Sequence, residues 1–458
     1  MHAYAVIGAN FGDEGKGLMT DFLARRSKNP NRCLVVRYNG GAQAGHTVVD
    51  SATGRRHVFG HIGAGTFAGA NTYLASPFIV NLFALLTEYK QLESLGVDTS
   101  SFKVIINYEC HVTTVFDIAL NGLRELARSR NPAKRHGSCG MGINETVTRG
   151  THGKAITVRK LLECDHADLG ALLHEIYDTY WKPQLEEIVA AVKDNSITNT
   201  LEWLELVALM NITDEASMLT LLKKELFGSK TRLVSASHGA SLHASYDSVI
   251  FEGAQGLMLD EQLGAFPHVT RSITGLPAVT QVASEVGVTN ITPVYVTRAY
   301  TTRHGAGQLK HECLEGHYDF LDKSVIEDKT NKFGAWQGAF RHARLDLQET
   351  LSFIEKDLER AKTTEILFRV KINKPRLAVT HLDIRFSNGF VTFKNIYGQD
   401  VVWTRDSCAM LENLISDEVD KSRVSNVMGL RIAYESFGET AETVDTKYTR
   451  LDLLSVNA

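Results

Sequence analysis

The chain has 458 residues, of which 43% are hydrophobic and 22% are charged, as is typical of soluble globular proteins. Its 49 basic and 53 acidic residues give a formal net charge of −4, and no basic stripe runs through the sequence, so nucleic acid is not an expected partner. The six cysteines form no Cys-x-x-Cys pair, and no apolar run approaches about 20 residues, which argues against a disulfide framework, a zinc site and a membrane partner. The N-terminus reads as a strand and not as a signal peptide, so we expect a cytoplasmic protein.

Short apolar segments recur along the chain, and segments with helical spacing separate many of them. This alternation favours an α/β fold with a large, mostly parallel central sheet flanked by helices, similar to P-loop NTPases. We expect one domain over residues 1–458, and ligands in such folds bind at the C-terminal ends of the strands. The predicted strands span residues 3–8, 33–38, 103–108, 248–253, 291–297 and 376–382.

A glycine-rich turn follows the first predicted strand and precedes a helical pattern. It reads Gly12-Asp13-Glu14-Gly15-Lys16-Gly17, and such a turn presents backbone N–H groups at the positive end of a helix, where phosphate binds. Lys16 adds a positive charge for terminal phosphates. Asn10 and Gly17 stand where a Walker A loop requires Gly and Ser or Thr, so this loop is a different motif. An acid in a phosphate cradle, Asp13, would repel the ligand unless it binds a metal ion or handles a proton.

The second predicted strand leads into another glycine-rich loop, residues 39–47, which ends in His46 and Thr47. An imidazole at this point can act as an acid or a hydrogen-bond donor near neutral pH. Residues 137–146 form a third glycine loop, in which Ser138 and the backbone amides could hold phosphate. Viewed alone, each loop is also compatible with an ordinary surface turn.

Residues 158–227 differ from the rest, because Leu185, Ile188, Val189 and Val192 recur at helical spacing. We predict a helical insertion within the single domain, and its expected role is scaffold or dimer surface. No residues in it have catalytic spacing.

The later predicted strands are also followed by polar segments. Gln255 lies in Phe-Glu-Gly-Ala-Gln-Gly at 251–256, a setting that suits recognition of a base or phosphate, and a polar segment at 267–270 ends in Thr270. Residues 297–307 contain two arginines, and paired arginines suit carboxylate or phosphate binding. A glycine loop at 334–341 ends in Arg341. Asp383 follows the last predicted strand, where a carboxylate can accept hydrogen bonds from N1–H and the 2-amino group of guanine.

Together these segments resemble the adenylosuccinate synthetase family. The family motif Gly-Asp-Glu-Gly-Lys-Gly is intact at 12–17, Gly-Gly-x-x-Ala-Gly-His-Thr at 40–47, and Phe-Glu-Gly-Ala-Gln-Gly at 251–256. The family motif Lys-Ala-Tyr-(Ser/Thr)-Thr-Arg-x-Gly-Ala-Gly corresponds to Arg298 through Gly307. The four motifs occur in the family's order along the whole chain.

The resemblance implies a ligase that joins L-aspartate to C6 of a 6-oxopurine nucleotide, IMP, through a 6-phosphoryl intermediate driven by GTP. In such an enzyme Asp13 resembles the base that removes the purine N1 proton, and His46 resembles the acid that stabilises the transferring phosphoryl group. Lys16 would hold the phosphates, and Mg²⁺ would be bound by Asp13 and the Gly45 carbonyl. The family is also expected to form a homodimer.

The resemblance implies three sets of binding residues. The expected residues for the nucleoside triphosphate are Gly12, Glu14, Gly15, Lys16, Gly17, Gly45, Thr47, His381 and Asp383. Those for the purine monophosphate are Asp13, Gln43, Ser138, Cys139, Gln255 and Thr270. Those for aspartate are Arg303, Gln337 and Arg341.

The chain departs from the family at several of these positions. The aspartate loop, usually Gly-Ala-Thr-Thr-Gly-Arg-x-Arg, retains only its last arginine, Arg341. The Trp-Gln-Gly sequence of this loop is closer to that of a divergent phage and archaeal branch of the family. Some members of this branch act on deoxyguanylate with ATP. His381 replaces the lysine normally two residues before the guanine-selecting acid, Gln43 replaces an asparagine, and Met141 stands where the third loop has an arginine.

Asp13 favours the hypoxanthine nucleotide, because the best-known enzymes of that branch carry a small residue there. Guanine also has an N1 proton, so the same chemistry on GMP or dGMP with ATP stays open. A purine-nucleotide-binding protein without turnover is an alternative of another class, but an intact acid–base pair argues against it. Arg149 and Lys154 are both candidates for the residue donated across the dimer interface.

Overall fold

The chain is described here from a computed structural model, which places residues 2–128, 137–192, 195–227, 231–234, 242–313, 331, 338–383, 391–394, 400–403 and 431–446. Within these ranges the largest sheet has eleven strands, in the order β17-β16-β13-β9-β1-β8-β2-β5-β6-β7, with β12 paired to β9 beside this path. These strands are β1 (His2–Gly8), β2 (Cys33–Arg37), β5 (Asn71–Leu74), β6 (Val104–Asn107), β7 (Thr231–Val234), β8 (Ser248–Gly256), β9 (Asn290–Arg298), β12 (Lys371–Ile372), β13 (Arg376–Thr380), β16 (Arg431–Ser436) and β17 (Val444–Thr446).

The sheet is parallel except at one edge, where β16 pairs antiparallel with β17. This confirms the predicted fold class, and all six predicted strands are present, with ends within three residues of the prediction. Strand β5 was not predicted, because Asn71 and Thr72 make its sequence half polar. Both side chains are buried and bond backbone: Asn71 accepts from Lys103 N at 2.8 Å, and Thr72 accepts from Gly63 N at 2.8 Å.

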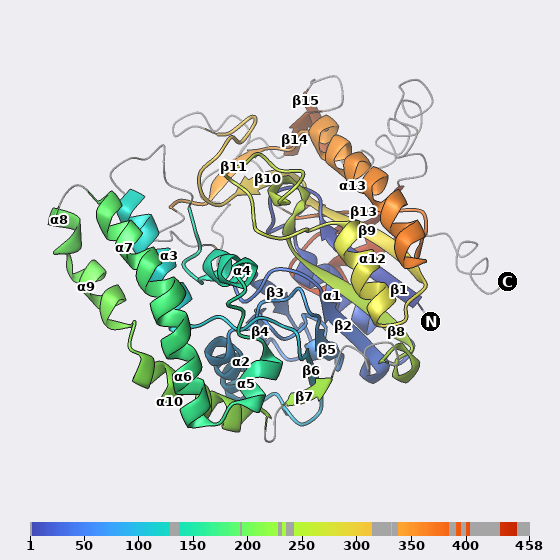
Figure 1. Cartoon of the computed structure of the whole chain (residues 1–458). Helices are drawn as coiled ribbons and strands as arrows, with labels where there is room; N and C mark the ends of the chain where they lie inside the picture. The colour runs from blue at the N-terminus through green and yellow to red at the C-terminus, as the bar shows by residue number, and fades with distance from the viewer. Residues whose placement is uncertain are drawn as a thin grey trace.

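Helices cover both faces of the sheet, because alternate residues of its strands point to opposite sides. Ile7 of β1 packs in one apolar core with α12 (Leu276–Glu285) and α13 (Leu347–Phe368). Val6 packs in another with α1 (Lys16–Arg25). Figure 1 shows α12 and α13 beside the sheet and α1 among the strands. Because β1, β2, β8, β9 and β13 run parallel, their C-terminal ends lie along one edge of the sheet.

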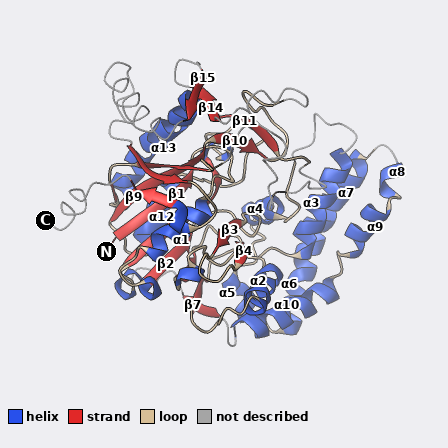
Figure 2. Cartoon of the chain, turned by 180° about the vertical axis from the view of Figure 1, so that it is seen from behind, coloured by secondary structure: helices blue, strands red, loops and turns tan. Residues whose placement is uncertain are grey.

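A second region is helical and has a core of its own, in which Trp181 stacks on Phe116 with ring centroids 4.4 Å apart. Figure 2 shows it as a helical lobe on the opposite side of the molecule from β1 and β9. Its helices include those of residues 158–227. They are α2 (Leu82–Ser94), α3 (Val115–Arg128), α4 (Ile143–Thr151), α5 (Val158–Glu163), α6 (His166–Ile176), α7 (Lys182–Ala191), α8 (Asn195–Thr198), α9 (Leu201–Ala208) and α10 (Ile212–Phe227), with a π-helical turn at Tyr177–Trp181.

Three two-stranded sheets extend from the body: β3 (His46–Val49) with β4 (Arg56–Phe59), β10 (Tyr300–Arg303) with β11 (Arg341–Arg344), and β14 (Val391–Lys394) with β15 (Asp400–Trp403). Short 3-10 helices occupy Pro30–Arg32, Thr66–Ala68, Leu242–Ser245, Leu257–Leu259 and Ala441–Thr443. Among the residues described, no helix combines the length and apolarity needed to cross a membrane.

A buried carboxylate, Asp357 of α13, ties α13 to α12 and to β9. It accepts hydrogen bonds from Leu276 N at 3.0 and 3.1 Å and from the Tyr295 hydroxyl at 2.8 Å. Burial raises the pKa of Asp357 from 3.8 to about 7, although these hydrogen bonds and the charge of Arg360 oppose the increase. The carboxyl group therefore retains its proton at a pH where an exposed aspartate has lost it.

We predict that the pH dependence of stability reports on Asp357. The folded state holds a proton that the unfolded state releases, so the contribution to stability is complete below about pH 4 and is lost as the pH rises through about 7. Asp357→Asn cannot ionise, and its unfolding temperature should fall less than that of the wild type between pH 5 and pH 8. The exposed Asp214→Asn serves as the control and should follow the wild type. Parallel profiles for all three proteins would contradict the assignment.

Candidate active site

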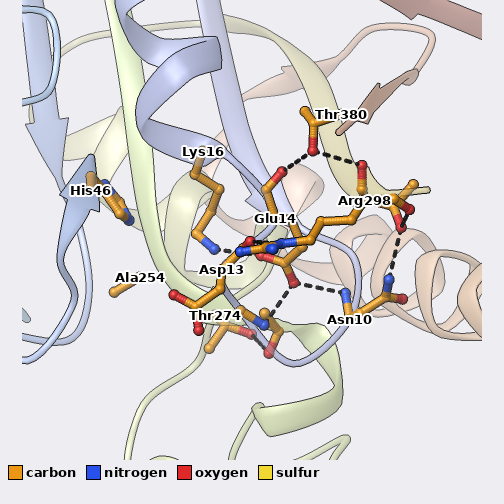
Figure 3. Close-up of polar contacts among 12 residues, drawn as sticks. Asn10, Asp13, Glu14, Lys16, His46, Ala254, Thr274, Arg298 and Thr380 are labelled. Carbon is orange, nitrogen blue, oxygen red and sulfur yellow. Dashed lines mark hydrogen bonds and ion pairs between the residues drawn. The ribbon is translucent and has the colours of Figure 1, made fainter. Parts of the chain in front are cut away.

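The loop between β1 and α1 is organised by the carboxylate of Glu14, which lies inside it. Glu14 Oε1 accepts from Asn10 N at 3.1 Å and from Gly12 N at 2.7 Å, and Oε2 accepts from Lys16 Nζ at 2.6 Å. The Glu14 and Lys16 side chains are both almost fully buried. The two residues expected to bind triphosphate therefore bind each other, as Figure 3 shows.

The first turn of α1 presents its backbone amides without a capping side chain. Gly15, the N-cap, has φ 89°, a conformation that favours glycine, and no side chain accepts a hydrogen bond there. Thr380, at the end of β13, donates its hydroxyl to the Glu14 carbonyl at 2.7 Å and so fixes this turn from outside. The result is a helix N-terminus whose uncapped amides suit an anion.

Asp13 occupies the bend of the loop with φ 61°, a conformation uncommon for a residue with a side chain. Its carbonyl accepts a hydrogen bond from Arg298 Nε at the end of β9. Its carboxylate is 28% exposed, and Oδ2 lies 3.5 Å from His304 Nε2. The Asp13 side chain is thus held at its base and available to a ligand at its tip.

His46, the first residue of β3, lies against the start of α1. A Cβ atom at Gly17 would be 2.9 Å from His46 Cβ and 3.0 Å from the Thr47 carbonyl, so only glycine allows this approach. His46 Nδ1 lies 2.6 Å from Glu252 Oε1, so the contact with Glu252 uses Nδ1 and not Nε2. Burial lowers the pKa of His46, and the charges of Arg37 and Lys16 lower it further, although Glu252 opposes them. The imidazole is therefore neutral at pH 7, and Nδ1–H donates to Glu252.

Glu252 and Arg37 form the buried support behind His46. Glu252 Oε2 accepts from Ala64 N at 3.1 Å and lies 3.8 Å from Arg37 Nε. Burial alone would raise the pKa of Glu252, but its interactions with His46 and with the charged Arg37 outweigh burial and hold that pKa below its ordinary value. Arg37 is completely buried, and its three guanidinium nitrogens have no hydrogen-bond partner among the described residues.

Sequence reasoning assigned no role to Glu252 or Arg37. A signal was present for both, because each is a charged residue within a predicted buried strand.

Two glutamines expected to bind the purine monophosphate converge beside Gly40. A Cβ atom at Gly40 would lie 3.4 Å from both Gln43 Nε2 and Gln255 Oε1. The Oε1 atoms of Gln43 and Gln255 are buried and have no hydrogen-bond partner within the described part of the chain. Buried amide oxygens without partners are costly, so this point is suited to a polar ligand.

The third glycine loop packs against the loop after β10, because a Cβ atom at Gly137 would lie 2.7 Å from Gly305 Cα. Ser138 donates to Asn121 Oδ1 at 2.7 Å and accepts from Gly140 N at 3.1 Å. Burial raises the pKa of the Cys139 thiol, so this side chain is a neutral thiol at pH 7. Ser138 and Cys139 therefore lie near the other loops, with the Ser138 hydroxyl bonded within the protein.

The two arginines expected at the aspartate pocket are paired across the β10–β11 hairpin, where Arg303 lies opposite Arg341. Arg303 is buried, and burial together with the charge of Arg341 lowers its pKa to about 10. It donates to the Gln308 carbonyl at 2.7 Å. Glu312 binds Arg341 through two hydrogen bonds of 2.6 and 2.5 Å.

Arg341 also donates to the carbonyls of Gly305 and Gly307 at 3.0 and 2.9 Å. It therefore ties the 304–307 loop to β11. Gln337, the third expected aspartate ligand, lies outside the described residues. Thr270 is fixed by its backbone, whose N–H donates to the Leu259 carbonyl at 2.8 Å.

The end of β13 carries His381 and Asp383. His381 has φ 60°, and its Nδ1 lies 2.8 Å from the Thr380 hydroxyl, which in turn bonds the Glu14 carbonyl. His381 meets the Tyr300 ring edge-to-face at 6.0 Å. Burial raises the pKa of Asp383. His381 is thus linked through Thr380 to the first loop.

The structure separates the two candidates for an interface residue. Arg149 is completely buried, bonds both carboxylate oxygens of Asp117 at 3.0 and 2.9 Å, and lies over the Trp181 ring. It is part of the helical core and cannot extend to a partner. Lys154 lies outside this core and pairs with Glu175 at 2.9 Å.

The chain is similar to proteins of one known family. A family model for adenylosuccinate synthetase matches residues 5–347. Adenylosuccinate synthetases of Clostridium botulinum and Clostridium beijerinckii are 32% identical over 350 and 349 residues, covering 74% of this chain and 72% of each relative.

Two solved structures share the fold. The fully ligated adenylosuccinate synthetase of Plasmodium falciparum superposes with a TM-score of 0.65 at 17% identity, over 98% of this chain and 100% of that one. The succinoaminodeoxyadenylate synthetase of cyanophage S-2L, bound to dGMP and dATP, gives 0.56 at 13% identity, over 99% and 98%. Identities this low support the similarity of fold alone.

We predict that Glu252→Gln lowers the pKa of His46 further. The substitution removes the negative charge that partly offsets burial, while Arg37 and Lys16 remain. NMR titration of ¹⁵N-labelled histidine measures the change, and the exposed Glu261→Gln is the matched control. A His46 pKa at or above the wild-type value would contradict the assigned contact.

Proposed function

Because the chain belongs to the adenylosuccinate synthetase family, we propose that it joins L-aspartate to C6 of IMP through a 6-phosphoryl intermediate driven by GTP, giving adenylosuccinate. It is a ligase that forms a C–N bond. The observation that carries the proposal is that Asp13 and His46 belong to two segments that pack together at Gly17. The Asp13 side chain is partly exposed there, and His46 lies against Gly17. The homodimer and a cytoplasmic location are also proposed from the family.

Asp13 is the proposed base. Its partly exposed carboxylate accepts the N1 proton of the purine, which increases the electron density on O6. O6 then attacks the γ-phosphorus of GTP, the bond to the β–γ bridging oxygen breaks, and GDP leaves. The glutamine pair at Gly40 supplies polar groups for the purine nucleotide. The aspartate amine next attacks C6, phosphate leaves from it, and the amine loses a proton.

His46 is the proposed partner of the transferring phosphoryl group. Its Nδ1–H is held by Glu252, so Nε2 is the ring atom available to a ligand. Negative phosphate oxygens stabilise an added proton on an imidazole. Triphosphate binding is therefore expected to raise the pKa of His46, which burial lowers. When GTP is bound, His46 therefore donates a hydrogen bond to the phosphoryl group that is transferred.

The residues present fit Mg²⁺. Asp13 offers a partly exposed carboxylate and the exposed Gly45 a carbonyl, both hard oxygen ligands. Among the residues described, no group of three or more His, Cys, Asp or Glu side chains is positioned to hold a metal. When bound, Mg²⁺ neutralises charge during phosphoryl transfer.

The alternative acceptor, GMP or dGMP with ATP, is favoured by the residue changes at the donor and aspartate sites. His381 replaces the family's lysine and contacts Tyr300, and of the two arginines in the family's aspartate loop this chain keeps only Arg341. A panel of reactions distinguishes the alternatives: L-aspartate and Mg²⁺ with IMP, GMP or dGMP, each with GTP or ATP, followed by product mass and phosphate release. The proposal predicts adenylosuccinate from IMP and GTP. Product from a guanylate alone supports the alternative, and no phosphate release in any pairing supports a binding protein.

We predict that Asp13→Asn and His46→Asn each lower turnover by about 100-fold or more, because each removes an acid–base group from the phosphoryl-transfer step. Circular dichroism and the unfolding temperature check that the fold is retained. A near-normal rate in either folded variant would exclude the assigned role.

We predict that Arg341→Ala raises the KM for aspartate by about 10-fold or more and the KM for the nucleotides less, because the 304–307 loop loses its tie to β11. Glu312→Gln, which removes only the ion pair, is the matched control and should have the smaller effect. Equal increases for aspartate and nucleotides would show that Arg341 serves another step.

A further inference from the structure

Three residues at which this chain departs from the family motifs, or fills a variable position in them, meet around Asp13. Arg298 replaces the family's lysine, His304 occupies the variable position after the motif arginine, and Phe340 belongs to the changed aspartate loop. The His304 and Phe340 rings lie 4.5 Å apart, and the Arg298 guanidinium lies 5.6 Å from the Phe340 centroid. Phe340 therefore contacts both side chains that hold Asp13.

The two contacts to Asp13 act on different atoms. Arg298 donates to the backbone carbonyl and also to the Tyr300 hydroxyl at 2.7 Å. His304 Nε2 faces carboxylate Oδ2 at 3.5 Å. Lys16, the cation next along the loop, is bonded to Glu14 instead. His304 is thus the side chain that the structure places at the Asp13 carboxylate.

The orientation of the His304 ring follows from its neighbours. Nε2 lies 3.1 Å from Asn331 Oδ1 as well as 3.5 Å from Asp13 Oδ2, and both atoms are acceptors, so Nε2 carries a hydrogen. Nδ1 is buried and has no hydrogen-bond partner among the residues described. The packing of the ring against Phe340 fixes its plane.

We propose that His304 is a positioning residue for Asp13. Its Nε2 bonds Asn331 Oδ1 at 3.1 Å and borders Oδ2 at 3.5 Å, so the imidazole limits the rotation of the carboxylate and leaves Oδ1 to face the purine N1–H. The Asp13 side chain is 28% exposed, so a neighbour at one carboxylate oxygen helps to set the direction of the other. The inference rests on the proposed function, in which Asp13 is the base.

Two variants test the inference in the full-length protein. His304→Leu keeps similar volume but has no donor, and it should lower kcat by about 10-fold or more with little change in the KM for either nucleotide. His304→Gln restores an N–H near the position of Nε2 and should recover most of the rate. His342→Leu is the matched control. His342 lies on β11, and its ring centroid is 5.0 Å from that of the same Phe340, so the kcat of this variant should stay near the wild-type value. Equal losses in the Leu and Gln variants would show a packing role and overturn the proposal.

A double-mutant cycle tests whether His304 acts through Asp13. In the Asp13→Asn background, His304→Leu should change kcat less than 2-fold, since the group it positions is already altered. A full further loss would overturn the proposal.

The contact is also measured without turnover. In ¹⁵N-histidine spectra of the empty protein, Asp13→Asn should shift the Nε2 resonance of His304, identified by its absence in His304→Gln. An unchanged resonance overturns the positioning contact. Failure of wild-type ligation with this resonance shifted as expected would instead refute the proposed function alone.

Discussion

A single buried carboxylate, Glu14, sets the geometry on which the site depends. Its two oxygens bind the amides of Asn10 and Gly12 on one side and the Lys16 ammonium on the other. These bonds shape the bend that directs Asp13 outward and leaves the first amides of α1 without a cap. A charge buried this deeply is stable only when its bonds are satisfied, so the loop has one conformation and not several.

The parallel sheet extends this order to the other loops. Because the strands run in the same direction, their C-terminal ends bring segments distant in sequence together along one edge. Glu252 from β8 reaches His46 on β3, and Thr380 from β13 reaches the Glu14 carbonyl. The helical lobe has a separate core and contributes the Ser138 loop, which touches the loop at Gly305. The site is therefore assembled by both parts of the fold.

The sequence was sufficient where a residue's role depends on its own segment. Continuous apolar runs identified six strands, and glycine turns after them identified the loops that hold Asp13, Lys16 and His46. Roles that depend on a distant partner were not predictable. Arg149 was a candidate for an interface but is enclosed by Asp117 and Trp181, and the contact of His304 with Asp13 joins residues 291 positions apart. Glu14 bonds residues of its own loop, and its expected contact with the triphosphate stays a prediction. The assigned ligand contacts of the glutamines and of Asp383 stay predictions.

The register of the β10–β11 hairpin has an energetic consequence. It sets two guanidinium groups, Arg303 and Arg341, across from each other, and Glu312 hydrogen-bonds Arg341 but offsets the charge of Arg303 only through space. Mutual repulsion is a strain that the folded protein tolerates without a ligand, and a dicarboxylate arriving between the two would relieve it. In the proposed aspartate site, such repulsion lowers local stability and favours binding of a dicarboxylate, so mutations that stabilise the hairpin would be expected to weaken that binding.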